Sequence, residues 1–134
     1  IIATDLSSEM LSKCSQGLYD ELSLARGLSP QRRAMFFQPH ESGQMQVKPE
    51  VRNMVSFRSL NLLTSYAALG RFDIVFCRNV LIYFSADVKQ KILQQIGQLQ
   101  PAGVLFLGAS ESISAASDTY AMIKCNPGLY YQKK

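Results

Sequence analysis

The chain opens with an apolar run, Ile1–Thr4, that ends at the carboxylate of Asp5. Such a run is typical of a strand inside a parallel sheet, so a buried strand is predicted here. Apolar positions at helical spacing follow and predict one helix, capped by Ser7 or Ser8 and ended at Gly27. Because natural domains rarely begin in a buried strand, we expect further sequence upstream of it.

Residues 28–60 are interpreted as a small inserted β-subdomain within a partial α/β domain that spans residues 1–134. The pattern predicts a short helix and a hairpin, together with the turns that join them. The predicted helix and strands are 31–37, 44–48 and 55–60, and the turns are 39–43 and 49–53.

The second half of the chain is predicted to contain a strand, a helix and a second strand, followed by a hairpin. Its predicted elements are a buried strand at 72–77, a helix from Ser85 to about Leu99, a buried strand at 103–107, and a hairpin over 120–132. This alternation predicts an open α/β sheet, in which ligands bind at the carboxyl ends of the strands.

Polar residues stand at several of those strand ends, and spacing alone leaves their roles open. The carboxylate of Asp5 suits either the two hydroxyls of a ribose or the capping of a helix, and no GxGxxG loop occurs in the chain. Arg78, Asn79 and Tyr83 fit either a functional site or an ion pair beside core aromatic residues. Asn61 also follows a predicted strand.

Composition excludes several classes. With 134 residues and 18% charged residues the chain is one domain or part of one, and no apolar run reaches the length of a membrane span. Three separated Cys and one His leave no metal set and indicate a reducing cytoplasm. Cys77 is expected in the core, His40 in solvent, and Ser110 with Glu111 lacks the His base of a nucleophile pair.

The net charge of +4 is unevenly distributed: residues 1–25 carry a net charge of −3 and residues 59–134 carry +3. Residues 26–58 carry six Lys or Arg against two Glu, a local net charge of +4. This surplus could steer an acidic partner but is too small to indicate nucleic acid, so no nucleic-acid partner is expected.

A set of segments, in order along the chain, carries a family signature: Ile2–Ser7, Arg26–Pro30, Val47–Glu50, Leu60–Leu63 and Gly70–Phe84. The last contains the highly specific stretch CRNVLIYF, and Gly103–Glu111 is similar to a GxxxxxGHSE segment. The chain therefore resembles the CheR family of bacterial chemotaxis receptor glutamate O-methyltransferases.

The resemblance implies a Rossmann-like methyltransferase sheet with strand order 3-2-1-4-5-7-6, in which strand 7 is antiparallel. It also implies methyl transfer from S-adenosyl-L-methionine to glutamate side chains on the cytoplasmic helical bundle of methyl-accepting chemotaxis receptors, with S-adenosyl-L-homocysteine as the product. Six site residues are implied, all bordering the cofactor or the transferred methyl group. They are Asp5 at the ribose, Asn61 and Leu62 at the adenine, Arg78 and Asn79 beside the cofactor, and Tyr83 as the catalytic tyrosine.

The chain also departs from the family pattern. The first, central strand and the N-terminal helical domain are missing, so we expect unpaired strand edges in mid-sheet, completed by the missing N-terminal segment of the same protein or by another chain. Ala109 replaces a His of the family. The short loop Gln38–Met45 favours a member that needs no receptor C-terminal pentapeptide.

Two alternatives to a receptor methyltransferase remain. One is a non-catalytic CheR-like interaction module or inactive fragment, which the missing glycine loop favours. The other is a methyltransferase that acts on a small acid, which the RNVLIYF stretch disfavours.

Overall fold

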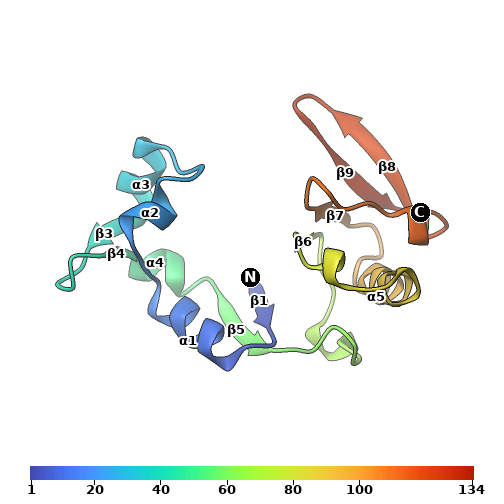
Figure 1. Ribbon diagram of the computed structural model, residues 1–134, viewed down its shortest axis with the longest axis horizontal. Coiled ribbons are helices and arrows are strands. Elements are labelled where there is room, and N and C mark those ends of the chain that lie inside the picture. Colours follow the sequence, from blue (N-terminus) through green and yellow to red (C-terminus); the bar gives the residue numbers. More distant parts are fainter. The chain divides into compact units, whose positions relative to one another are not determined.

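The computed structural model describes residues 1–134, the side chain of Ala115 excepted, and the chain divides into two compact units (Figure 1). The N-terminal unit is Ile1–Asn61 and the C-terminal unit is Leu62–Lys134. The N-terminal unit contains β1 (Ile2–Asp5), α1 (Ser8–Gln16), β2 (Leu18–Tyr19), α2 (Glu21–Leu24), α3 (Pro30–Phe36), β3 (Phe37–Pro39), β4 (Met45–Val47), α4 (Pro49–Arg52) and β5 (Ser56–Ser59). The C-terminal unit contains β6 (Ile74–Cys77), α5 (Ala86–Leu99), β7 (Val104–Leu107), β8 (Tyr120–Cys125), β9 (Gly128–Lys133) and the short 3-10 helices η1 (Ala67–Leu69), η2 (Leu81–Tyr83) and η3 (Ser114–Ala116).

Two small sheets form the N-terminal unit. In one, β1 and β5 pair in parallel, with Asp5 opposite Ser59. In the other, β4 lies between β2 and β3 and is antiparallel to both. The predicted strand 55–60 therefore forms as β5, but it pairs with β1, and the hairpin of this region consists of β3 and β4. The boundary of 28–60 for the insertion stays a prediction.

The single helix predicted up to Gly27 is wrong, because α1 ends at Gly17 in the left-handed conformation (φ 65°). The main chain of β4 approaches Gly17 closely. The Val47 N–H donates to the Gly17 carbonyl at 2.8 Å, and a Cβ on Gly17 would lie 3.3 Å from the Val47 Cβ. Asp20 then caps the separate helix α2 through the Ser23 N–H. Tertiary pairing, which the helical spacing does not encode, interrupts the helix.

The C-terminal unit is a four-stranded sheet in the order β6-β7-β9-β8, seen with α5 in the yellow to red part of Figure 1. Strands β6 and β7 are parallel, whereas β9 is antiparallel to both β7 and β8. This is the 4-5-7-6 part of the expected order, and β5-β1 is the 3-2 part. The predicted terminal hairpin is confirmed. Within the described residues β1 pairs only with β5, and β6 only with β7.

The core of the C-terminal unit lies between α5 and its sheet. Ile92, Leu93, Ile96 and Leu99 are buried on one helical face, which confirms the helix predicted after Ser85. Buried polar groups are satisfied locally. Gln100 donates from Nε2 to the Val104 carbonyl at 2.7 Å and accepts from the Tyr120 hydroxyl at 2.9 Å. This pairing removes the cost of burying an amide.

Strand β6 is less buried than its apolar sequence predicts. Ile74 is 54% exposed and Phe76 is 70% exposed, although Phe76 stacks on Phe106 with ring centroids 5.1 Å apart. The prediction of a strand is confirmed and that of full burial is wrong. A strand with one neighbour and one covered face leaves half of its side chains in solvent.

Candidate functional site

The parallel pairing of β6 and β7 brings two polar segments to one edge of the C-terminal unit. Cys77 pairs with Leu107 at the ends of these strands. The segment that begins at Arg78 and the segment Gly108–Glu111 therefore leave the sheet side by side. This is the carboxyl edge, where α/β sheets bind their ligands.

Glu111 is the most constrained side chain at this edge. One carboxylate oxygen, Oε2, accepts the Asn79 N–H at 2.8 Å and the Gly108 N–H at 2.7 Å. The other, Oε1, accepts the N–H groups of Val80 at 2.9 Å and Leu81 at 2.7 Å. Burial alone would raise the pKa of Glu111, but these four donors together hold that pKa below its ordinary value.

Three of the predicted site residues lie on the segment that Glu111 holds. Arg78 and Asn79 are exposed, and Asn79 adopts the left-handed conformation with φ 60°. Leu81 is buried at 1% exposure and begins η2, whereas Tyr83 at its end is 81% exposed. Arg78, Asn79 and Tyr83 thus share one short, anchored segment, and all three are exposed.

The N-terminal unit holds two further predicted residues at the corresponding edge of its own sheet. Asp5 ends β1 and is exposed, and its carbonyl accepts the Leu60 N–H at 2.9 Å, directly before Asn61. The capping alternative for Asp5 is wrong: Ser7 is the N-cap residue of α1 and accepts the Met10 N–H at 3.2 Å. Asp5 instead accepts the Ser7 N–H at 2.8 Å, which fixes its carboxylate at the strand end.

Asn61 and Leu62 stand at the division between the two units. Both are half-buried, and Leu62 lies in a turn at the start of the C-terminal unit. The structure therefore brings Asp5 and Asn61 to one edge, and Arg78, Asn79 and Tyr83 to another. Their roles toward a cofactor stay predictions.

Other candidates have structural explanations. Cys77 is buried, and burial together with the nearby charge of Glu111 raises the pKa of its thiol to about 11, which suits a core residue. His40 is half-buried rather than fully solvated, and its Nδ1 contacts the Ser42 hydroxyl at 2.9 Å. It therefore stabilises the turn between β3 and β4.

Glu111 is the residue whose importance the sequence analysis missed. It was considered as part of a nucleophile pair with Ser110, and its position after a predicted strand was the available signal. The four main-chain donors come from two segments about thirty residues apart in the chain, so spacing alone could not reveal them.

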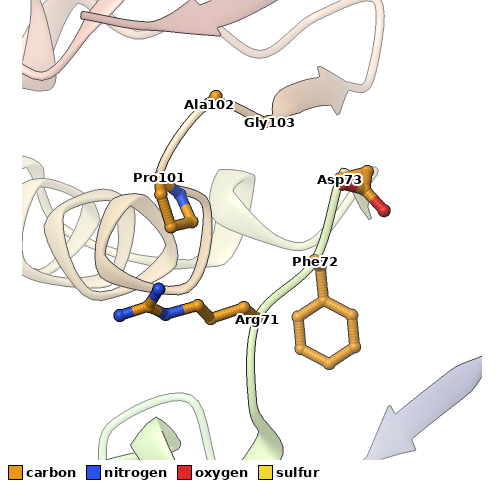
Figure 2. A pocket seen from close by; sticks show the side chains of 6 residues that line it. All are labelled: Arg71, Phe72, Asp73, Pro101, Ala102 and Gly103. Carbon is orange, nitrogen blue, oxygen red and sulfur yellow. The ribbon is translucent and has the colours of Figure 1, made fainter.

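A pocket at the opposite, amino edge of β6 and β7 carries no comparable chemistry (Figure 2). Its lining residues are Arg71, Phe72, Asp73, Pro101, Ala102 and Gly103. Figure 2 shows the Arg71 and Asp73 side chains pointing away from each other. The close approach of the segments that contain Phe72 and Gly103 explains this glycine, since a Cβ on Gly103 would lie 2.7 Å from the Phe72 carbonyl oxygen.

Metal-ligating clusters and membrane-spanning helices are both absent from the part of the chain that the structure describes. Among the side chains described, no group of three or more His, Cys, Asp or Glu could hold a metal ion. No helix formed by the described residues has the length and apolar character needed to cross a membrane.

Comparison with solved structures defines the class of fold. The chain superposes on magnesium protoporphyrin IX methyltransferase from Synechocystis PCC 6803, solved with bound SAM, with a TM-score of 0.57 and 14% identity. The match covers 99% of this chain and 59% of that chain. Together with the strand order, it shows a Rossmann-like methyltransferase fold.

Sequence comparison then gives the family. Residues 1–129 match the model of the CheR methyltransferase, SAM-binding domain, so the chain belongs to the CheR methyltransferase family. It is 53% identical over 135 aligned residues to a chemotaxis protein methyltransferase of Vibrio anguillarum, and the match covers 100% of this chain and 49% of that protein. A chemotaxis protein methyltransferase of Escherichia coli is 41% identical over 120 residues, covering 85% of this chain and 41% of its own length. The chain thus spans about half the length of the curated relatives it matches.

Proposed function

We propose that the full-length protein transfers methyl groups from S-adenosyl-L-methionine to glutamate side chains of methyl-accepting chemotaxis receptors. Membership of the CheR family carries this proposal. The names of the relatives, which are chemotaxis protein methyltransferases, support the same activity. The three separated, free cysteines of the chain are compatible with action in the cytoplasm.

The residues at the two carboxyl edges fit the parts of this cofactor. Asp5 offers an exposed, oriented carboxylate, which can accept two hydrogen bonds from a ribose. Asn61 and Leu62, one polar and one apolar and both half-buried, would line the adenine. Arg78 and Asn79, exposed beside Glu111, would border the rest of the cofactor.

Tyr83 would orient the substrate carboxylate. When bound, S-adenosyl-L-methionine would supply a methyl group on a positively charged sulfur. The methyl–sulfur bond would break as the carboxylate oxygen bonds to the methyl carbon, and S-adenosyl-L-homocysteine would be the leaving group. Glutamate, with an unperturbed pKa of about 4.3, is already ionised at neutral pH, so no strong general base is needed. The work of the protein is alignment and partial removal of water, and the exposed Tyr83 hydroxyl can donate to the incoming carboxylate.

The receptor surface is proposed from charge and loop length. The basic residues of 26–58 would attract acidic receptor helices. The β3–β4 turn is short and closed, since the His40 N–H donates to the Gln44 carbonyl at 2.9 Å. This tight turn supports methylation that does not depend on a receptor C-terminal pentapeptide.

Two measurements on the full-length protein test the proposal. One is a calorimetric titration with S-adenosyl-L-homocysteine, and the other is an assay of receptor methylation. We expect Asp5→Ala to weaken binding about 10- to 100-fold, because hydrogen bonds to a charged group are lost. Tyr83→Phe should leave binding intact and lower methyl-ester formation about tenfold or more. Tyr130→Phe, the same change at a tyrosine of the β8–β9 hairpin, is the matched control and should change neither.

Two results would overturn the proposal. If the wild-type protein does not bind S-adenosyl-L-homocysteine, the alternative of a non-catalytic interaction module is favoured. If Tyr83→Phe turns over at the wild-type rate, the catalytic role of Tyr83 is wrong even where the cofactor binds.

A further inference from the structure

We propose that Glu111 is a positioning residue for methyl transfer, whose carboxylate holds the main chain of Asn79–Leu81 and thereby places Tyr83 at the end of the same turn. This inference rests on the proposed function for the roles of Asn79 and Tyr83. It adds a residue that the family resemblance does not assign. Glu111 would act through the segment and would not contact the substrate or the cofactor.

The carboxylate of Glu111 is enclosed by main-chain donors. It is 9% exposed and accepts four N–H groups at 2.7 to 2.9 Å. Among the described side chains, the ion pairs are Lys13–Glu9 and Arg33–Glu21, so no cation neutralises Glu111. Its charge is stabilised by the three consecutive amides of Asn79–Leu81 and by the amide of Gly108, and each of those amides is oriented by the carboxylate in return.

The surrounding geometry leaves little room for another arrangement. A Cβ on Gly108 would lie 2.4 Å from the Asn79 Oδ1 and 2.7 Å from the Glu111 Oε2. Asn79 holds a positive φ of 60°, a conformation that persists in non-glycine residues only where the surroundings determine it. Gly108, Asn79 and Glu111 therefore form one closely fitted group.

The turn η2 connects the main chain that Glu111 holds to Tyr83. Leu81, which donates to Glu111 and is buried, starts this helical turn, and the Tyr83 N–H donates to the Val80 carbonyl at 3.3 Å. The Tyr83 ring is 81% exposed and adds little to the core. Because Leu81 is buried and Tyr83 is exposed, the same anchored turn serves both the core and the placement of the exposed side chain.

Substitution of Glu111 in the full-length protein separates positioning from stability. In Glu111→Gln only one oxygen remains, so either the Asn79 and Gly108 pair or the Val80 and Leu81 pair of donors loses its acceptor. Glu111→Asp keeps the charge and both oxygens with a shorter reach. Ser110→Ala, at the exposed neighbouring position, is the matched control.

All constants are measured per folded protein, at a temperature where circular dichroism shows each variant folded. We expect Glu111→Gln to lower kcat about 10²-fold and to weaken S-adenosyl-L-homocysteine binding, with the KM for receptor unchanged. Glu111→Asp should recover at least about tenfold of that loss. Wild-type kinetic constants in Glu111→Gln, or no recovery in Glu111→Asp, would overturn the proposal.

A second measurement decides the case if Glu111→Gln does not fold. In the wild-type protein, amide hydrogen exchange at Asn79, Val80 and Leu81 should be as slow as in strand β7, and rapid exchange there contradicts the proposal. A wild-type protein that neither binds cofactor nor transfers methyl groups would defeat the proposed function. The exchange rates would still decide whether Glu111 holds the segment.

Discussion

The ionisation of Glu111 is coupled to the stability of the fold, because its carboxylate accepts four main-chain N–H groups. Burial alone would raise the pKa of Glu111 above the ordinary value of about 4.3, but the four amide donors outweigh burial, so the pKa in the folded protein is lower. The ionised carboxylate therefore stabilises the fold fully above the ordinary pKa. That stabilisation is lost as the pH falls through the lower, folded-state value.

This predicts a specific acid sensitivity of the full-length protein. At pH 7, Glu111→Gln should lower the free energy of unfolding by about 1.5 to 3 kcal/mol, because a charged acceptor of main-chain donors is removed. As the pH falls below the ordinary pKa and through the lower, folded-state value, the wild-type and variant values should converge. Urea denaturation from pH 7 to pH 3 measures this, and two parallel curves would contradict the assignment.

Leu81 and Tyr83 lie in the same short turn but differ sharply in exposure. Leu81 is 1% exposed and Tyr83, two positions later, is 81% exposed. The aromatic-rich sequence between Arg78 and Ser85 left open whether these residues were core or site. The turn η2 directs Leu81 inward and Tyr83 outward, so Leu81 belongs to the core and Tyr83 does not.

Helix α5 contributes its apolar face to the core of the C-terminal unit. Its Ile92, Leu93, Ile96 and Leu99 are buried, and it begins directly after the segment that carries Tyr83. Most of the stability of such a helix comes from its apolar face, not from intrinsic propensity.

Leu93→Ala should lower the free energy of unfolding by about 2 to 5 kcal/mol, since the side chain is 0% exposed and its removal leaves a cavity. The neighbouring Gln94→Ala, at an exposed position of the same helix, should stay within about 0.5 kcal/mol of wild type. Chemical denaturation compares the three proteins. Equal stabilities of the two variants would show that this face of α5 is not part of the core.

Elements with a strong local pattern were predicted correctly, whereas an element that ends at a tertiary contact was not. The 72–77 and 103–107 strands, the helix after Ser85 and the terminal hairpin each have a strong local pattern, and all four form. The first helix was predicted too long because a close contact between Gly17 and β4, thirty residues later, ends it.

At the scale of the whole molecule, net charge would affect the rate at which the protein associates with the proposed receptor substrate. The net charge is +4, and residues 26–58 alone carry a net charge of +4. Attraction between exposed charges is screened within roughly 8 Å at physiological ionic strength. An acidic receptor surface would therefore be approached more slowly as salt rises.

We expect kcat/KM for receptor methylation to fall several-fold, on the order of tenfold, between low salt and about 0.5 M salt. S-adenosyl-L-homocysteine binding, measured in the same buffers, serves as the control and should change much less. Steady-state kinetics at several salt concentrations checks this. A salt-independent kcat/KM would contradict electrostatic attraction of the receptor.

The sequence by itself determined the family, the alternation of strands and helices, and the strand ends that carry Asp5, Asn61, Arg78, Asn79 and Tyr83, because these depend on local pattern and on a specific motif. Only the tertiary structure decided that β5 pairs with β1, that Gly17 ends the first helix, and that Glu111 gathers four amides from two distant segments. The physical reason is the same in each case. Main-chain hydrogen bonds and close approaches join residues that are far apart in the chain, and no local periodicity records them.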